Sequence, residues 1–247
     1  MATDLETDEL TFPRDGDTLR AYAAWPRGRP SLPGLVLVHD VRGLSEHYRD
    51  VTRRFAAEGF FTLALDLYAR EGAPALPDMA AVFRWMRALP DRRVLGDVGA
   101  AVGLLAARPE VRAEAIGITG FCMGGQYALM AASTVPGLAA CVSWYGMLRY
   151  AETDAVKPAS PLTLASDLAC PYLGLFGAED AIIPPADVEE LRAILARTEK
   201  PSEIEVYAGA GHAFFNDTRP DAYRPAVAAA AWPRALAFLR RHLGATA

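Results

Sequence analysis

The chain has 247 residues, of which 52% are hydrophobic and 22% charged, and its formal net charge is −5. This composition supplies enough apolar side chain for a sizeable core and is unlike that of disordered chains. The negative charge argues against a nucleic-acid-binding protein, which needs a basic face. The three cysteines form no CxxC pair, which argues against a disulfide framework or a zinc site and favours a reducing compartment.

The N-terminal segment MATDLETDEL is acidic and lacks the basic and apolar regions of a secretory signal. No uninterrupted apolar run in the chain reaches the length that spans a membrane. We therefore expect a soluble cytoplasmic protein with no membrane or nucleic-acid partner, present as a monomer or a weak homodimer. Residues 1–8, approximately, are expected to form a flexible N-terminus.

The predicted elements begin with two short strands joined by an Asp-Gly turn, after which strands alternate with helices. The strands are expected at residues 8–12, 19–25, 35–38, 61–65, 115–121, 139–142, 172–176 and 204–207. The helices are expected at residues 48–58, 78–89, 95–107, 123–134 and 186–197, followed by a C-terminal helix that is kinked or restarted at Pro233. Residues 147–168 show little periodicity and are interpreted as an irregular excursion over the sheet.

This alternation is typical of an α/β fold with a mostly parallel central sheet and helices on both faces. No repeat, low-complexity tract or linker divides the chain, so residues 1–247 are predicted to form one domain. The polar segments that follow the strands are then expected to gather beyond the carboxyl ends of the sheet.

One of these segments, Gly120 to Gly124, has the pattern glycine-x-nucleophile-x-glycine, with Cys122 at its centre. It joins an apolar strand to a helix, as does the nucleophile elbow of α/β-hydrolases. Glycines flank the nucleophile because strand and helix must pack closely around a strained turn. A cysteine placed there lies at a helix N-terminus, which favours a thiolate. The alternative is that Cys122 is a buried small hydrophobe, as most free cysteines are.

Two later loops supply partners for this cysteine. Asp180 and His212 each follow a predicted strand, and the order nucleophile, acid, histidine is the one that α/β-hydrolases use. The histidine can take the thiol proton, and the carboxylate can orient the imidazole and stabilise its protonated form. Asp180 could also be a turn residue only. Asp167 is a second candidate acid, but it precedes its strand and is expected at the wrong end of the sheet.

The remaining cysteines, Cys141 and Cys170, lie in or beside strands and are interpreted as inert core residues. A redox-sensing role for Cys122 is disfavoured because no resolving cysteine lies near it in the sequence.

Four motifs together resemble the dienelactone hydrolase family: Gly-Phe-Cys-Met-Gly-Gly, Gly-Ala-Glu-Asp-Ala-Ile-Ile-Pro, Gly-Ala-Gly-His-Ala-Phe and Asp-Leu-Tyr-Ala-Arg. The resemblance runs from about residue 10 to the C-terminal helix. It implies an α/β-hydrolase fold, hydrolysis of ester bonds through a triad of Cys122, Asp180 and His212, and an oxyanion hole formed by the backbone N–H groups of Val41 and Met123.

The chain departs from the family pattern at two places. The family's dienelactone hydrolases carry a glutamate near the resting thiol, where this chain has the shorter Asp40; its charge would disfavour the thiolate, or it would only support the loop. The family holds the substrate carboxylate with two arginines, and Arg70, Arg84 and Arg87 cannot be matched to them. A more apolar ester is therefore an alternative to dienelactone. The substrate contacts are expected from Tyr68, Arg70, Tyr145 and Phe214.

The sequence thus predicts a cysteine-dependent hydrolase of ester or lactone bonds that forms a thioester acyl-enzyme and needs no metal or organic cofactor. The alternative is an α/β-hydrolase-like protein that binds a ligand or partner without turnover, which fold alone does not exclude.

Overall fold

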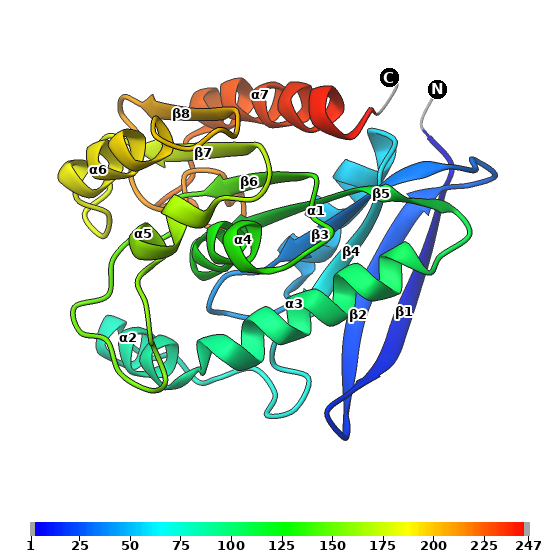
Figure 1. Cartoon of the computed structure of the whole chain (residues 1–247), viewed down its shortest axis with the longest axis horizontal. Helices are drawn as coiled ribbons and strands as arrows, with labels where there is room; N and C mark the ends of the chain where they lie inside the picture. The colour runs from blue at the N-terminus through cyan, green and yellow to red at the C-terminus, as the bar shows by residue number, and fades with distance from the viewer. Residues whose placement is uncertain (1–2, 245–247) are drawn as a thin grey trace.

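The computed structural model describes residues 3–244, which fold around one eight-stranded sheet in the order β1-β2-β4-β3-β5-β6-β7-β8 (Figure 1). The strands are β1 (Leu5–Arg14), β2 (Asp17–Pro26), β3 (Leu32–Val38), β4 (Phe61–Asp66), β5 (Val111–Phe121), β6 (Ala140–Trp144), β7 (Tyr172–Gly177) and β8 (Ser202–Tyr207). β1 and β2 pair antiparallel, as do β2 and β4, and all the later pairs are parallel. The predicted α/β fold with a mostly parallel sheet is confirmed.

The helices are α1 (Glu46–Ala57), α2 (Met79–Ala88), α3 (Asp91–Ala106), α4 (Met123–Thr134), α5 (Pro161–Leu164), α6 (Pro185–Leu195) and α7 (Pro225–Leu243), with a short 3-10 turn, η1 (Ala165–Asp167). α3 and α4 lie on one face of the sheet in Figure 1, and α1 and α7 lie on the other. The last two meet where the rings of Phe55 and Trp232 approach to 4.4 Å. Helices on both faces bury the inner strands β3, β4, β6 and β7, so their sequences are almost continuously apolar.

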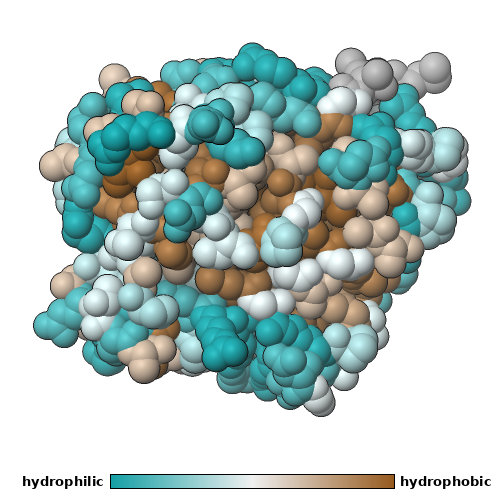
Figure 2. All heavy atoms as spheres, in the orientation of Figure 1, coloured by the Kyte–Doolittle hydropathy of each residue, from teal (hydrophilic) through white to brown (hydrophobic). Residues whose placement is uncertain are grey.

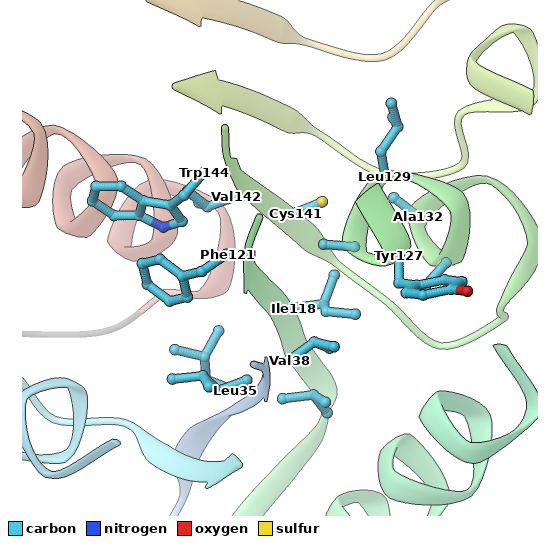
Figure 3. Close-up of a cluster of buried hydrophobic side chains, with 14 of the residues drawn as sticks. Leu35, Val38, Ile118, Phe121, Tyr127, Leu129, Ala132, Cys141, Val142 and Trp144 are labelled. Atoms are coloured by element: carbon cyan, nitrogen blue, oxygen red, sulfur yellow. The ribbon is translucent and has the colours of Figure 1, made fainter. Parts of the chain in front are cut away.

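Buried side chains of β3, β5 and β6 fill the centre of the molecule between α4 and α7 (Figure 3). Side chains alternate along each strand, so Trp144 and Val142 point to the α7 face, while Cys141 points to the α4 face. Figure 2 shows that apolar residues also reach the surface among hydrophilic ones on the face that carries α3 and α4. The core therefore fixes the strand ends, where the polar loops gather.

The structure differs from the sequence-based expectation at several boundaries. β1 begins at Leu5, which pairs with Pro26, so the expected flexible segment is already part of the sheet from that residue on, while residues 1–2 lie outside the described part of the chain. The 147–168 excursion contains α5 and η1. α7 continues through Pro233 as one helix.

Candidate active site

The strand-to-helix turn at Cys122 has the geometry that the elbow pattern predicts. β5 ends at Phe121 and α4 begins at Met123, with Cys122 between them at φ 56° and ψ −117°. A residue other than glycine rarely adopts a positive φ, and holding one there costs about 1–3 kcal/mol. The Cys122 N–H donates to the Trp144 carbonyl at 2.9 Å, which helps to hold the turn.

The flanking glycines are required by close backbone contacts. A Cβ atom on Gly120 would lie 2.0 Å from the carbonyl oxygen of Gly124, and one on Gly124 would lie 2.1 Å from that of Val38. Backbone atoms cannot move aside as the end of a flexible side chain can. The elbow sequence is thus explained by the crossing of β5, β3 and α4.

The three residues of the predicted triad are brought together from the ends of three elements. Nε2 of His212 lies 3.1 Å from Sγ of Cys122, and Nδ1 of the same ring lies 2.8 Å from Oδ2 of Asp180. The other carboxylate oxygen of Asp180 accepts the N–H groups of Ile182 at 2.8 Å and Ile183 at 3.3 Å. The acid is therefore fixed by its own loop and is buried behind the imidazole.

The charges around His212 favour its protonated form. Burial lowers the pKa of His212, but the charge of Cys122, the hydrogen bonds to Asp180 and Cys122 and the charge of Asp180 outweigh burial and raise the pKa to about 10. An imidazolium between two negative groups is the arrangement in which a thiolate is stabilised as an ion pair.

A second histidine, His39, to which no role was assigned from the sequence, joins the loops after β3 and β4. His39 is fully buried, and its Nε2 accepts the Leu67 N–H at 3.1 Å. The ring proton therefore sits on Nδ1, which donates to the Asp40 carbonyl at 2.6 Å. Burial lowers the pKa of His39 against the opposing effect of this hydrogen bond. The neutral ring ties the loop after β3 to the loop after β4.

The residues expected to form the oxyanion hole lie beside the thiol. Val41 and Met123 line the same cavity as Cys122, and neither backbone N–H donates a hydrogen bond to another residue within 3–244. The carboxylate of Asp40 accepts the Arg42 N–H at 2.8 Å. No hydrogen bond joins Asp40 to Cys122 in the described part of the chain, although both line the cavity, so the modulator role stays a prediction.

The catalytic cavity, which Cys122 and His212 line, has a volume of about 140 Å³ and is mainly apolar apart from these two residues, Asp40 and two arginines. Arg42 follows Val41 in the loop after β3, which we call the oxyanion loop, and Arg219 lies in the loop that carries His212. Sequence reasoning considered Arg70, Arg84 and Arg87 and missed Arg219, which two consecutive turns, at Ala213–Asn216 and Asn216–Arg219, carry back to the cavity. Asn216 at the junction of these turns was the available signal.

The expected substrate contacts lie outside the wall of this cavity. Arg70 is held by Asp97 at 2.7 Å and by Asp17, on the hairpin side of the molecule. Tyr145 and Phe214 are buried, and the Tyr145 ring packs against His212 at 5.3 Å. These two aromatic side chains support the histidine from behind.

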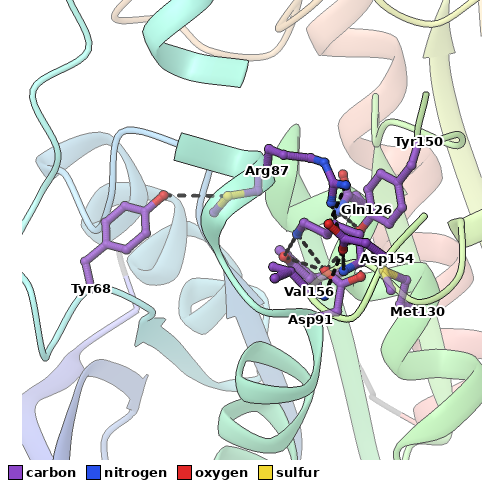
Figure 4. Close-up of polar contacts among 11 residues, drawn as sticks. Tyr68, Arg87, Asp91, Gln126, Met130, Tyr150, Asp154 and Val156 are labelled. Atoms are coloured by element: carbon purple, nitrogen blue, oxygen red, sulfur yellow. Dashed lines mark hydrogen bonds and ion pairs between the residues drawn. The ribbon is translucent and has the colours of Figure 1, made fainter. Parts of the chain in front are cut away.

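Tyr68, the fourth expected contact, is also buried and braces the oxyanion loop. Its hydroxyl donates to the Val41 carbonyl at 3.0 Å and lies 3.6 Å from Sδ of Met123, the contact drawn as a dashed line in Figure 4.

The alternative site residues do not reach the cavity. Asp167 belongs to η1 and precedes β7, at the opposite end of that strand from Asp180. Cys141 and Cys170 are buried, and burial raises the pKa of both thiols, that of Cys170 to about 12. Both are therefore unreactive core thiols.

The sheet order and the strand–nucleophile–helix elbow define an α/β-hydrolase. The chain matches the model of the dienelactone hydrolase family over residues 19–243, and it belongs to this family as a dienelactone hydrolase-like hydrolase. No helix within the described residues has the length and apolar character needed to cross a bilayer.

Three relatives cover nearly the whole chain. A Bradyrhizobium protein assigned as a 2-oxo-3-(5-oxofuran-2-ylidene)propanoate lactonase is 36% identical, over 98% of this chain and 98% of its own length. A Salmonella typhimurium protein assigned as a carboxymethylenebutenolidase is 38% identical, over 95% of this chain and 87% of its own length. A crystal structure of a Klebsiella pneumoniae protein assigned as a dienelactone hydrolase superposes with a TM-score of 0.90 at 37% identity, covering 96% of this chain and 99% of that one.

Proposed function

We propose that the protein hydrolyses ester or lactone bonds through Cys122 as nucleophile, His212 as proton carrier and Asp180 as the group that orients the imidazole. The observation that carries this proposal is the continuous chain of contacts Sγ–Nε2 at 3.1 Å and Nδ1–Oδ2 at 2.8 Å. A thiolate held by an imidazolium on a strained turn is an activated nucleophile.

In the first half of the reaction the thiolate of Cys122 attacks the substrate carbonyl. The negative charge that develops on the carbonyl oxygen is stabilised by the N–H groups of Val41 and Met123. The tetrahedral intermediate collapses with cleavage of the C–O bond, and His212 donates its Nε2 proton to the departing alkoxide or enolate oxygen. The acyl group is now a thioester on Cys122.

In the second half, neutral His212 takes a proton from a water molecule, and the hydroxide attacks the thioester carbonyl. Collapse of this intermediate breaks the C–S bond and releases the carboxylic acid, while Cys122 leaves as a thiolate beside the imidazolium. Asp180 keeps Nδ1 protonated throughout, so that Nε2 faces the reacting atoms. Between turnovers the charge of Asp40 opposes the thiolate of Cys122, and the imidazolium of His212 stabilises it.

The substrate class that fits the cavity is a lactone or ester that carries a carboxylate. Arg42 and Arg219 are the arginines that line it, and a guanidinium binds a carboxylate well. The Bradyrhizobium and Salmonella relatives are named for lactones that bear a propanoate and a carboxymethylene group. These observations favour an anionic lactone over the apolar ester.

The role of Cys122 is tested with 4-nitrophenyl acetate, a small activated ester. Cys122→Ala is expected to abolish turnover while keeping the circular dichroism spectrum and the melting temperature of the parent protein. Cys170→Ala removes a thiol away from the site and is the matched control, expected to retain activity. Full activity of Cys122→Ala would overturn the proposal, and stoichiometric labelling of Cys122 without release would favour ligand binding without turnover.

The substrate class is tested with a lactone that bears a carboxylate and its methyl ester. Arg219→Gln is expected to raise KM for the anionic lactone by about tenfold or more, since a hydrogen bond to a charged group contributes about 1.5–3 kcal/mol, and to leave KM for the neutral lactone unchanged. Arg27→Gln, a surface change in an exposed ion pair, serves as control. Equal effects of Arg219→Gln on both lactones would contradict the assignment.

A further inference from the structure

A second cavity lies directly behind one wall of the catalytic cavity. Its volume is about 610 Å³, and it lies between α2, the start of α4 and the segment that follows β6. Phe83 and Met86 of α2 and Met147 line both cavities. A single layer of three apolar side chains, two of them flexible methionines, thus separates the second cavity from the thiol of Cys122.

The two volumes suit different parts of a substrate. Cavities that hold a whole small molecule usually measure ~300–1,000 Å³. The catalytic cavity, at about 140 Å³, is below this range, whereas the second cavity, at about 610 Å³, is within it. A substrate larger than the reacting group therefore has room on the far side of the methionine and phenylalanine wall.

The helix that covers this wall is loosely attached. Met86 is the one fully buried residue of α2, and Met79 and Phe83 are 51% and 44% exposed, at the mouth of the catalytic cavity. Figure 1 shows α2 away from the central layers, next to the segment that follows β6.

A buried polar atom of a residue that lines the second cavity lacks a partner within residues 3–244. Gln126, in the first turns of α4, is 1% exposed, and its Oε1 accepts no hydrogen bond from the residues within 3–244. A buried acceptor without a donor is rare, and a ligand hydroxyl or N–H group would satisfy it.

The orientation of the Gln126 amide follows from its neighbours. The Tyr150 hydroxyl has one proton, which it donates to the carboxylate of Asp91 at 3.1 Å. It must therefore accept from Gln126, whose Nε2 lies 2.6 Å away, and Oε1 is left as the free atom. Figure 4 shows this network joining Gln126, Tyr150 and Asp91.

The side of the thiol on which the second cavity lies indicates which part of a substrate enters it. The leaving oxygen must lie next to Nε2 of His212 to receive its proton. None of the residues that line the second cavity comes from the loops that carry His212 or Asp180. Its lining comes instead from α2, the first turns of α4 and the segment that follows β6, which leaves it for the acyl part.

We infer that the second cavity is an acyl subsite, which takes an extended apolar acyl chain carrying a hydroxyl or N–H group that donates to Oε1 of Gln126. The inference rests on the proposed hydrolase function and assigns its acyl specificity. Phe83, Met86 and Met147 are then the residues past which the chain enters, and the preferred esters are longer in the acyl part than a bare five-membered lactone.

The length of the acyl chain is tested with 4-nitrophenyl acetate, butanoate and octanoate. Ala80 lines the second cavity one turn before Phe83 and Arg84, so Ala80→Trp projects into it. The ratio of kcat/KM for octanoate to that for acetate is expected to fall at least tenfold in Ala80→Trp. Ala88→Trp, on the same helix but outside both cavities, is the matched control and is expected to keep the parent ratio.

The acceptor is tested with Gln126→Met, which keeps the length of the side chain and removes both polar atoms. The parent protein is expected to prefer 8-hydroxyoctanoate over octanoate esters by about tenfold, and the variant to lose this preference while retaining its octanoate-to-acetate ratio.

The outcomes separate the inference from the function on which it rests. If Cys122-dependent hydrolysis of acetate is present but Ala80→Trp and Ala88→Trp have the same octanoate-to-acetate ratio, the acyl subsite is overturned and the hydrolase function stands. If alcohol length rather than acyl length responds to Ala80→Trp, the cavity takes the leaving group and the inference is wrong. If no ester is hydrolysed in a Cys122-dependent way, both fail.

Discussion

The hydroxyl of Tyr68 donates a hydrogen bond of 3.0 Å to the carbonyl of Val41, and the same oxygen lies 3.6 Å from Sδ of Met123. One buried side chain from the loop after β4 therefore touches both residues whose N–H groups are proposed to hold the oxyanion. The Val41 carbonyl shares its peptide plane with the Arg42 N–H, whereas the Val41 N–H shares a plane with the Asp40 carbonyl, which accepts from Nδ1 of His39. Tyr68 thus anchors the loop after β3 through the Val41 carbonyl and does not line the cavity itself.

Tyr68→Phe should reduce kcat while leaving KM nearly unchanged, because the Val41 carbonyl loses its partner and the loop is no longer fixed. Loss of one oxyanion donor reduces kcat by ~100-fold or more, so misplacement of a donor that is still present should reduce it by about tenfold. The measurement is steady-state kinetics with 4-nitrophenyl acetate. Tyr172→Phe is the control, since that buried hydroxyl has no partner among the described residues; an equal loss in both variants would contradict a specific role for Tyr68.

The raised pKa of His212 gives a second prediction. Burial alone would lower this pKa from its ordinary value of 6.5, and the charge of Cys122 is the largest opposing cause. Removing that charge by Cys122→Ala should therefore shift the His212 titration downward from about 10, and the imidazole should lose its proton at a lower pH than in the parent protein. NMR titration of the ring C–H resonances of both proteins measures the two midpoints. A midpoint that does not fall in the variant would show that the thiolate–imidazolium pair is absent.

Much of the fold, and the gathering of Cys122, Asp180 and His212 at one end of the sheet, could be predicted from the sequence because local patterns dictate them. At Gly120 and Gly124 an added Cβ would lie within 2.1 Å of a backbone atom, so only glycine fits at either position. Two glycines four residues apart in the sequence therefore indicate a strand and a helix that cross closely. Asp180 follows β7, whose apolar run is easily seen, and His212 follows β8, in which apolar residues alternate with Glu203 and Glu205. Parallel strands bring their carboxyl ends together.

The substrate side of the site could not be predicted in this way. Arg219 reaches the cavity through two consecutive turns, and Arg70 pairs with Asp97 of α3, a contact between residues distant in the sequence. The acyl subsite is formed by α2 and the excursion after β6, whose relative positions depend on tertiary contacts such as the ion pair of Arg87 with Asp154. Side-chain contacts of this kind leave no periodic signal in the sequence.

The excursion is anchored by a buried ion pair that sequence reasoning missed. Nζ of Lys157 lies 2.6 Å from Oδ1 of Asp91, and the side chains are 2% and 1% exposed. Burial lowers the pKa of Lys157, and the hydrogen bond and charge of Asp91 oppose this shift. The same carboxylate accepts the hydroxyls of Tyr127 and Tyr150, so Asp91 joins α3, α4 and the excursion.

Asp91→Ala should lower the free energy of unfolding by about 3–5 kcal/mol, because it leaves a buried ammonium group without its partner. Adding Lys157→Met should recover a large part of this loss, because it removes the buried ammonium group that Asp91→Ala leaves without a partner. Urea denaturation of the two variants measures both effects. Asp4→Ala, which breaks an exposed pair with Arg27, is the control and should change stability by less than ~1 kcal/mol. No recovery in the double variant would mean that Asp91 acts only through the tyrosines.

Two glycine-to-alanine changes should have opposite effects on stability. At Gly124 an added Cβ would lie 2.1 Å from the Val38 carbonyl oxygen, so Gly124→Ala must push α4 away from β3. Overpacking of this kind costs about 1–3 kcal/mol where side chains can give way, and more is expected here because both contacts are backbone. Gly103, inside α3, has no atom within 4 Å of the added Cβ, so Gly103→Ala should stabilise the helix by about 0.5–1 kcal/mol. Thermal unfolding of both variants compares them, together with the rate at which iodoacetamide labels Cys122. If Gly124→Ala melts at the parent temperature with an unchanged labelling rate, close packing of the elbow is not what holds the nucleophile in place.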